Sequence, residues 1–176
     1  MPEPRSLNPF HALQANRNFR LFWLGQTTSL IGTWMQTVAQ SWLALELTNS
    51  AFLVGVVSAA GSLPILLLSL YGGVIADRHN KLRIVTICQA LLLLEAGLLW
   101  WFTWSGRVTI HSLLILVTFS GLIGAFEIPA RQSLLVELVE REDLVDAIAL
   151  NSGGFNLARI VGPSIAAVVL ARAGLA

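Results

Sequence analysis

Five long apolar segments follow one another along this chain of 176 residues. They lie at about 18–45, 51–76, 83–104, 109–129 and 145–172. The hydrocarbon core of a bilayer is about 30 Å thick, and a helix needs about 20 apolar residues to cross it. In lipid, helices satisfy all their backbone hydrogen bonds internally. The chain is therefore predicted to be an all-α, polytopic membrane protein with about five transmembrane helices.

The composition agrees with this prediction and excludes several classes of function. Hydrophobic residues make up 55% of the chain and charged residues 12%, which argues against the alternative of a soluble helical bundle. A net charge of +1 without a basic, aromatic-rich cluster argues against nucleic acid as a partner. Cys88 is the only cysteine, and the three histidines form no His-Glu pair at ligand spacing. We therefore expect no metal, no cofactor and no enzymatic activity.

The basic residues predict the orientation, because Lys and Arg collect on the cytoplasmic side of a membrane protein. Those on the side of the N-terminus are Arg5, Arg17, Arg20, Arg78, Lys81, Arg83, Arg131 and Arg141. Arg107 and Arg172 lie on the other side. We expect residues 1–17 to form a cytoplasmic tail, residues 18–176 a multi-pass domain in the cell (inner) membrane, and residues 131–144 an amphipathic segment on the cytoplasmic surface.

A charged hairpin, residues 72–83, joins the second and third apolar segments. It resembles the loop signature of the major facilitator superfamily: Gly, three residues, Asp, a basic residue, any residue, Gly and two basic residues. The matching positions are Gly73, Asp77, Arg78 and Lys81. Asn80 replaces the second Gly, and Asn tolerates a left-handed turn better than most residues. Arg83 lies one step beyond the last basic position.

Other segments carry the same resemblance. Residues 159–167, with Gly162 and Pro163, resemble the Gly-Pro helix-packing motif of the fifth helix in the antiporter branch, although Ala158, Ala166 and Ala167 stand where glycine is usual. Residues 35–39, 47–50 and 129–133 resemble drug and siderophore (enterobactin-type) exporters. The resemblance covers essentially the whole chain, and it implies the N-terminal part of a transporter whose N-terminal half has six helices.

The resemblance implies a function for the hairpin. In the superfamily this loop is a conformational latch that helps to hold the outward-facing state. Here the latch would consist of Gly73, Asp77, Arg78, Lys81 and Arg83, with Gly73 allowing a neighbouring helix to approach closely. The alternative is that the basic residues only determine topology.

A polar stripe runs along the first apolar segment. Its residues recur every three or four positions, so they share one face of a helix: Gln26, Ser29, Thr33, Gln36 and Gln40. The resemblance implies that the first helix lines a central substrate cavity. The alternative is that these groups only hydrogen-bond to neighbouring helices.

Three ionisable residues lie inside the apolar segments: Glu95, Glu127 and Arg159. A charge within the bilayer is costly unless it is paired or hydrated, so such residues are functional candidates. Arg159 shares a face with Asn156 near the middle of its segment, and we expect it to bind an anionic substrate group or to pair with an acid such as Glu95. Glu127 lies one helical turn before Arg131 and either pairs with it or takes part in gating or proton movement.

These observations predict a secondary active transporter that exports a drug-like or siderophore-type molecule by alternating access. The chain would be a truncated N-terminal portion that needs the missing C-terminal half or a complementing chain. Its partners would be a small-molecule substrate and the lipid bilayer, with protons as a candidate coupling ion. The alternative function is a small non-transporting membrane protein, such as a subunit or an assembly factor.

Overall fold

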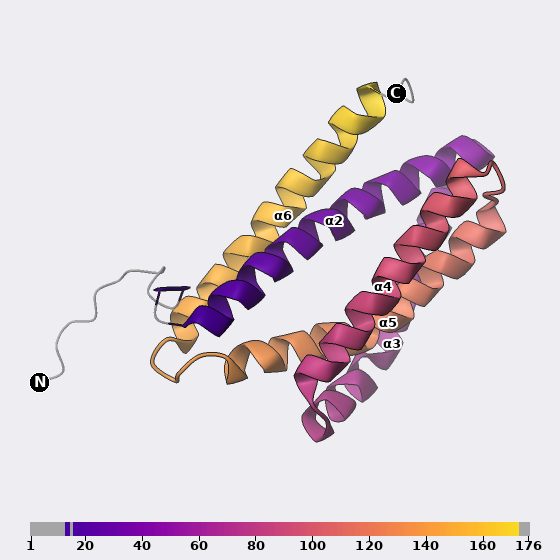
Figure 1. Ribbon diagram of the computed structural model, residues 1–176. Helices are drawn as coiled ribbons and strands as arrows, with labels where there is room; N and C mark the ends of the chain where they lie inside the picture. The colour runs from indigo at the N-terminus through magenta and orange to yellow at the C-terminus, as the bar shows by residue number, and fades with distance from the viewer. Residues whose placement is uncertain (1–12, 15, 173–176) are drawn as a thin grey trace, which may run out of the picture. The chain divides into compact units, whose positions relative to one another are not determined.

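The computed structural model describes residues 13, 14 and 16–172, and long helices account for most of this part. They are α2 (Arg17–Thr48), α3 (Ala51–Arg78), α4 (Lys81–Trp104), α5 (Ile110–Glu137) and α6 (Leu144–Arg172), as Figure 1 shows. The all-α class is confirmed. The predicted tail at residues 1–17 falls largely outside the described residues.

Four of these helices, α3 to α6, are long and apolar enough to cross a membrane. Although α2 has 32 residues, it is not among the four, because amides and hydroxyls interrupt its apolar sequence. The chain is therefore a polytopic helical membrane protein. That α2 also crosses the membrane, which would bring the number of spans to five, stays a prediction.

Short polar residues define the helix ends. Asn49 has a left-handed backbone (φ 49°) directly after α2. Ser50 and Asn80 are the N-caps of α3 and α4, where their side-chain oxygens accept hydrogen bonds from Leu53 N and Arg83 N. Gly106 (φ 67°) follows α4 in the left-handed region that glycine adopts without a steric penalty. The connections between α2, α3 and α4 are therefore tight turns.

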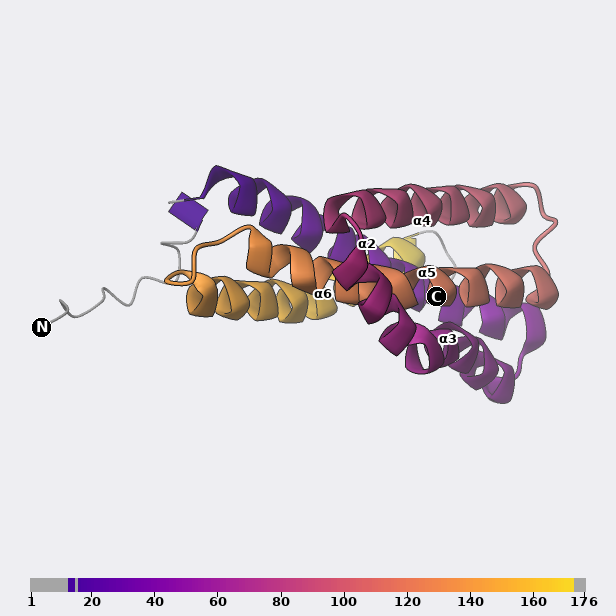
Figure 2. The ribbon, with the colours of Figure 1, turned by 90° about the horizontal axis from the view of Figure 1, so that it is seen from below.

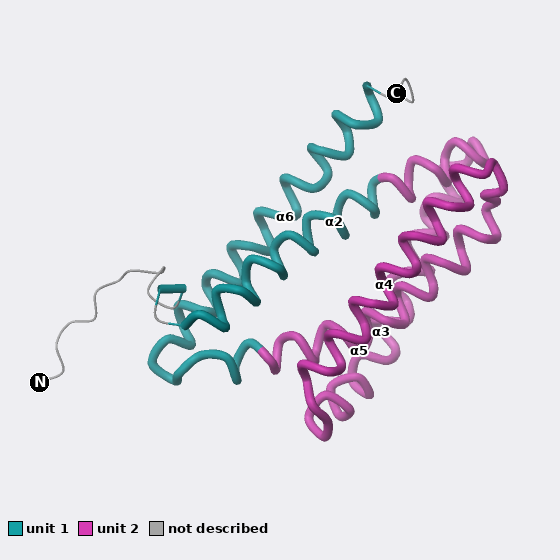
Figure 3. The backbone as a smooth tube through the Cα atoms, in the orientation of Figure 1, with its two compact units in different colours: residues 1–38, 135–176 teal, residues 39–134 magenta. Residues whose placement is uncertain are grey.

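The chain divides into two compact units, shown in Figure 3: residues 1–38 with 135–176, and residues 39–134. In the first unit, α6 runs alongside the first part of α2 (Figure 1). Trp23 Nε1 donates a hydrogen bond to the Leu150 carbonyl at 3.0 Å. A Cβ at Gly154 would lie 2.8 Å from Thr27 Oγ1, so the glycine permits the close contact between α6 and α2 at this point.

The second unit contains the end of α2 together with α3, α4 and most of α5. Its core includes Ala44, Val57, Leu113 and Val117, with Leu99 packed against them. Figure 2 shows α3 crossing α5, and glycines lie at this crossing. A Cβ at Gly72 would overlap the Ala125 carbonyl oxygen, and one at Gly121 would overlap the Gly61 carbonyl oxygen. The two backbones are therefore in direct contact.

The end of the fourth apolar segment differs from the sequence-based prediction. α5 passes through Pro129 and continues to Glu137, so it includes residues 131–137 of the segment predicted to be amphipathic. A proline can remain inside a membrane helix when its surroundings satisfy the freed backbone groups. Residues 138–143 form bends and turns before α6 begins at Leu144.

Candidate functional site

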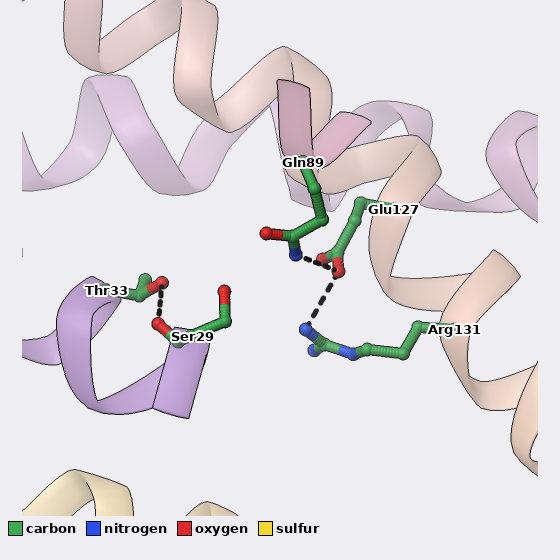
Figure 4. Close-up of polar contacts among 5 residues, drawn as sticks. All are labelled: Ser29, Thr33, Gln89, Glu127 and Arg131. Carbon is green, nitrogen blue, oxygen red and sulfur yellow. Dashed lines mark hydrogen bonds and ion pairs between the residues drawn. The ribbon is translucent and has the colours of Figure 1, made fainter. Parts of the chain in front are cut away.

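The polar stripe of α2 differs in burial along its length. Gln26 and Gln40 are buried, with exposed fractions of 7% and 8%, whereas Ser29 and Gln36 are half-buried and Thr33 is exposed. Thr33 Oγ1 donates a hydrogen bond to the Ser29 carbonyl oxygen at 3.0 Å (Figure 4). The hydroxyl of Thr33 is thus satisfied within α2, while Gln40 Nε2 is buried without a hydrogen-bond acceptor among the described residues.

Arg159 of α6 lies against an aromatic pair in the first unit. Its guanidinium carbon is 5.5 Å from the ring centroid of Trp34, within the range of a cation–π contact. Trp34 in turn meets Phe155 edge-on, with centroids 6.0 Å apart and ring planes at 73°. Asn156, on the same part of α6, donates its amide hydrogen bond to the Ser152 carbonyl. The sequence-based prediction singled out Arg159 and Asn156 but not the two rings.

Glu127 forms the centre of a hydrogen-bonded group in the second unit. Its Oε1 accepts from Arg131 Nη1 at 3.0 Å and from Gln89 Nε2 at 3.2 Å, as Figure 4 shows. Glu127 is 4% exposed. The pairing of Glu127 with Arg131 was one of the two alternatives from the sequence, whereas the link to α4 through Gln89 was not anticipated.

Glu95 is one of the largest fully buried side chains in the described part of the chain, at 1% exposure. It lies near the middle of α4. Leu99, one turn further on the same helix, packs against the core of the second unit. This places the Glu95 carboxyl inside the helix bundle of that unit.

The charged hairpin connects α3 to α4 at the surface. Asp77, Arg78 and Arg83 are exposed, and no described hydrogen bond or ion pair involves their side chains. Gly73 has no atom within 4 Å of an added Cβ; the close helix contact expected there occurs at Gly72. Asn80 is not left-handed: at φ −67° and ψ 110° it caps α4. The left-handed turn predicted at Asn80 is therefore wrong; its side chain caps α4 instead.

Gly162 of the predicted packing motif lies in the contact between α6 and α2. A Cβ at this position would be 2.7 Å from Trp34 Cβ and 2.8 Å from the Ile31 carbonyl oxygen. Pro163 follows it inside α6. Within the described residues, no group of three or more His, Cys, Asp or Glu side chains is arranged to hold a metal ion.

The long apolar helices define the class: a polytopic α-helical membrane protein. A family model described as "Transmembrane secretion effector", within the major facilitator superfamily, matches residues 6–176. Since the match covers nearly the whole chain, the chain belongs to this family.

Several curated proteins are similar to the chain. The staphyloferrin A transporter of Staphylococcus aureus is 32% identical over 80% of this chain and 36% of that protein. Macrolide efflux protein A of Streptococcus pyogenes is 24% identical over 86% of this chain and 37% of that protein. The multidrug efflux pump Tap of Mycolicibacterium fortuitum is 31% identical over 84% of this chain and 37% of that protein.

The chain thus spans a little over a third of the length of these relatives. No solved structure matches it.

Proposed function

We propose that this chain is the N-terminal part of a secondary active transporter that exports a small molecule by alternating access. The observation that carries the proposal is the family match over residues 6–176. The names of the relatives, which describe transport or efflux, support export of a siderophore-type or drug-like molecule. Because the chain spans about a third of these proteins, the activity belongs to a transporter that also supplies the remaining part, in the same polypeptide or as a complementing chain.

The proposed topology is a multi-pass protein of the cell (inner) membrane with a cytoplasmic N-terminus and five spans, of which α2 is the first. Basic residues on the hairpin side support it. Aromatic residues support it as well, since Trp and Tyr favour membrane interfaces. At the opposite end of α4, Trp100 and Trp104 stack with centroids 5.9 Å apart, and Trp101 packs against Trp104 at 5.7 Å. These exposed rings mark the proposed outer interface.

The proposed substrate path uses the polar stripe of α2 and the face of α6 that carries Asn156 and Arg159. Exposed polar groups near the middle of a membrane helix need water or protein around them. Glu95 and Glu127, buried carboxylates of α4 and α5, would take part in proton movement, and protons are the proposed coupling ion.

The proposed latch is the hairpin with Asp77, Arg78, Lys81 and Arg83. Asp77 is exposed and makes no described ion pair in this chain. Its basic partner would therefore belong to the rest of the transporter, or would come within reach only in another conformational state.

In the full-length transporter, Asp77→Asn should therefore lower efflux about 5–150-fold, the usual range for a coupling free energy of 1–3 kcal/mol. Glu46→Gln, which changes an exposed acid near the C-terminal end of α2, is the matched control and should retain efflux. Equal activities of both variants would rule out the latch.

Efflux from inside-out vesicles that carry the full-length transporter tests the proposed function. The vesicles are given a panel of lipophilic cations, macrolides and iron chelators, with and without a proton gradient. We expect gradient-dependent accumulation of at least one solute. Vesicles that contain folded, correctly inserted protein but accumulate none of them would favour the non-transporting subunit instead.

A further inference from the structure

Arg159, Trp34 and Phe155 form one cluster between the middle parts of α2 and α6. The guanidinium group of Arg159 lies over the ring of Trp34 at 5.5 Å, and Phe155 meets the same ring edge-on at 6.0 Å. Arg159 is exposed in this chain, and Phe155 retains 39% of its accessible surface. The cluster therefore presents a cation and an aromatic surface side by side.

The packing of α6 on α2 fixes the position of this cluster. Gly162 lies directly against Trp34 Cβ, and Ala158 is fully buried on the same face of α6. Since Gly162 has no side chain, the Trp34 ring can lie close to α6 and within reach of Arg159. Both Trp34 and Arg159 lie within two residues of the midpoints of their helices.

The contact with Trp34 leaves the charge of Arg159 available. No acidic side chain in the described part of the first unit pairs with Arg159, and the guanidinium has no described hydrogen bond. A guanidinium that lies over a ring still has its N–H groups along the edge, where they can bind a carboxylate with two parallel hydrogen bonds. A neutral ring does not cancel the charge, so the site favours an anion.

We propose that this cluster binds an organic anion in which a carboxylate is attached to a planar apolar group. The carboxylate binds along the free edge of Arg159, and the planar group packs against the exposed surface of Phe155. Trp34 holds the guanidinium in place from the other side. This inference rests on the proposed transport function and deepens it, since it names the class of substrate.

The test compares two probes that share one ring system and differ in charge. Purified full-length transporter in detergent is titrated with 2-naphthoate and, separately, with 2-naphthamide, and each affinity is measured by calorimetry. We expect 2-naphthoate to bind at least about tenfold more tightly than 2-naphthamide. Arg159→Gln should reduce the affinity for naphthoate to that for naphthamide, and Arg159→Lys should retain part of the preference, because a point charge remains but the planar fork is lost.

Two further variants separate the contribution of the aromatic surface from that of the charge. Phe155→Ala should weaken the binding of both probes by a similar factor, since it removes the surface on which both stack and leaves the charge of Arg159. Arg107→Gln removes an exposed cation at the end of α4 and should change neither affinity. Thermal unfolding of each variant establishes that it is folded.

Three results would overturn the proposal: no binding of 2-naphthoate to the wild-type transporter, equal affinities for the two probes, or a preference that survives Arg159→Gln. If Arg159→Lys restores the stability lost in Arg159→Gln while neither protein discriminates between the probes, then Arg159 pairs with an acid from the rest of the transporter. The proposed function would survive each of these results, since it depends on gradient-driven efflux; conversely, an absence of efflux would leave the naphthoate preference intact.

Discussion

At the scale of single residues, Asn80 explains how a departure from the family pattern is accommodated. Its Oδ1 accepts a hydrogen bond from Arg83 N at 2.9 Å, which satisfies one of the free N–H groups at the start of α4. Asn is among the best N-cap residues, and glycine is only slightly less favourable at this position. The superfamily glycine and the asparagine of this chain are therefore nearly equivalent for the helix that follows.

This equivalence predicts the effect of substitutions at Asn80. Asn80→Gly should cost a few tenths of a kcal/mol of unfolding free energy, and Asn80→Ala about 1 kcal/mol, because alanine cannot accept the Arg83 N–H bond. Chemical unfolding in detergent micelles measures both values. An Asn80→Ala variant as stable as wild type would show that the cap contributes nothing.

The buried carboxylate of Glu127 supports a second prediction at this scale. Glu127→Gln and Arg131→Gln should each cost about 1–3 kcal/mol, because each leaves a buried polar group with a poorer partner. The double variant should cost less than the sum of the two, by about 0.5–3 kcal/mol, since the residues are in direct contact. If the two losses of stability simply add, the 3.0 Å ion pair between Glu127 and Arg131 contributes nothing to the free energy of unfolding.

At the scale of helices, the backbones of α3 and α5 are in direct contact at their crossing. Gly72 and Gly73 are neighbours in the sequence, yet only Gly72 lies against the other backbone. An added side chain at Gly72 would push the helices apart, and such overpacking usually costs about 1–3 kcal/mol.

The two glycines thus form a matched pair of test positions. Gly72→Ala should lower the melting temperature of the purified protein by several degrees, whereas Gly73→Ala should leave it nearly unchanged. Thermal unfolding followed by circular dichroism measures both. A loss of stability in Gly73→Ala that equals the loss in Gly72→Ala would contradict the contact at this crossing.

The sequence predicted the apolar helices well, because length and hydropathy depend only on local composition. It could not tell which of two adjacent glycines faces α5, since that depends on the rotation of α3 in the bundle. It also placed the end of the fourth span near Pro129, whereas α5 continues to Glu137. Proline usually ends or bends a helix because it cannot donate a backbone hydrogen bond, but a membrane helix tolerates it where the surrounding structure satisfies the freed backbone groups.

At the scale of the whole molecule, the membrane topology is the feature that every functional proposal requires. Under the proposed topology α4 crosses the bilayer, so its two ends lie on opposite sides. The charged hairpin before α4 and the turn at residues 105–109 after it must then face opposite compartments.

Cysteine labelling can test this arrangement. In a Cys88→Ser background, His79→Cys should react with a membrane-impermeant maleimide only from the cytoplasmic side, and Arg107→Cys only from the outside. Intact cells and inside-out vesicles provide the two directions of access. Labelling of both positions from one side would refute the topology.

The candidate site was only partly predictable at this scale. Arg159 was identified because a charge in an apolar segment is conspicuous in a sequence. Its aromatic partners were not, since Trp34 and Phe155 look like ordinary apolar residues until α6 is packed on α2. Gln89 was missed for the same reason: its partner Glu127 is 38 positions away in the chain.

The backbone contacts at Gly61 with Gly121 and at Gly72 with Ala125 have a mechanical consequence. Where no side chains separate two helices, there is no compressible layer that would let them slide, and Cα–H groups can donate weak bonds to the facing carbonyls. In the proposed transport cycle α3 and α5 should therefore move together as one rigid unit, and any bending of the helices should be concentrated outside this pair.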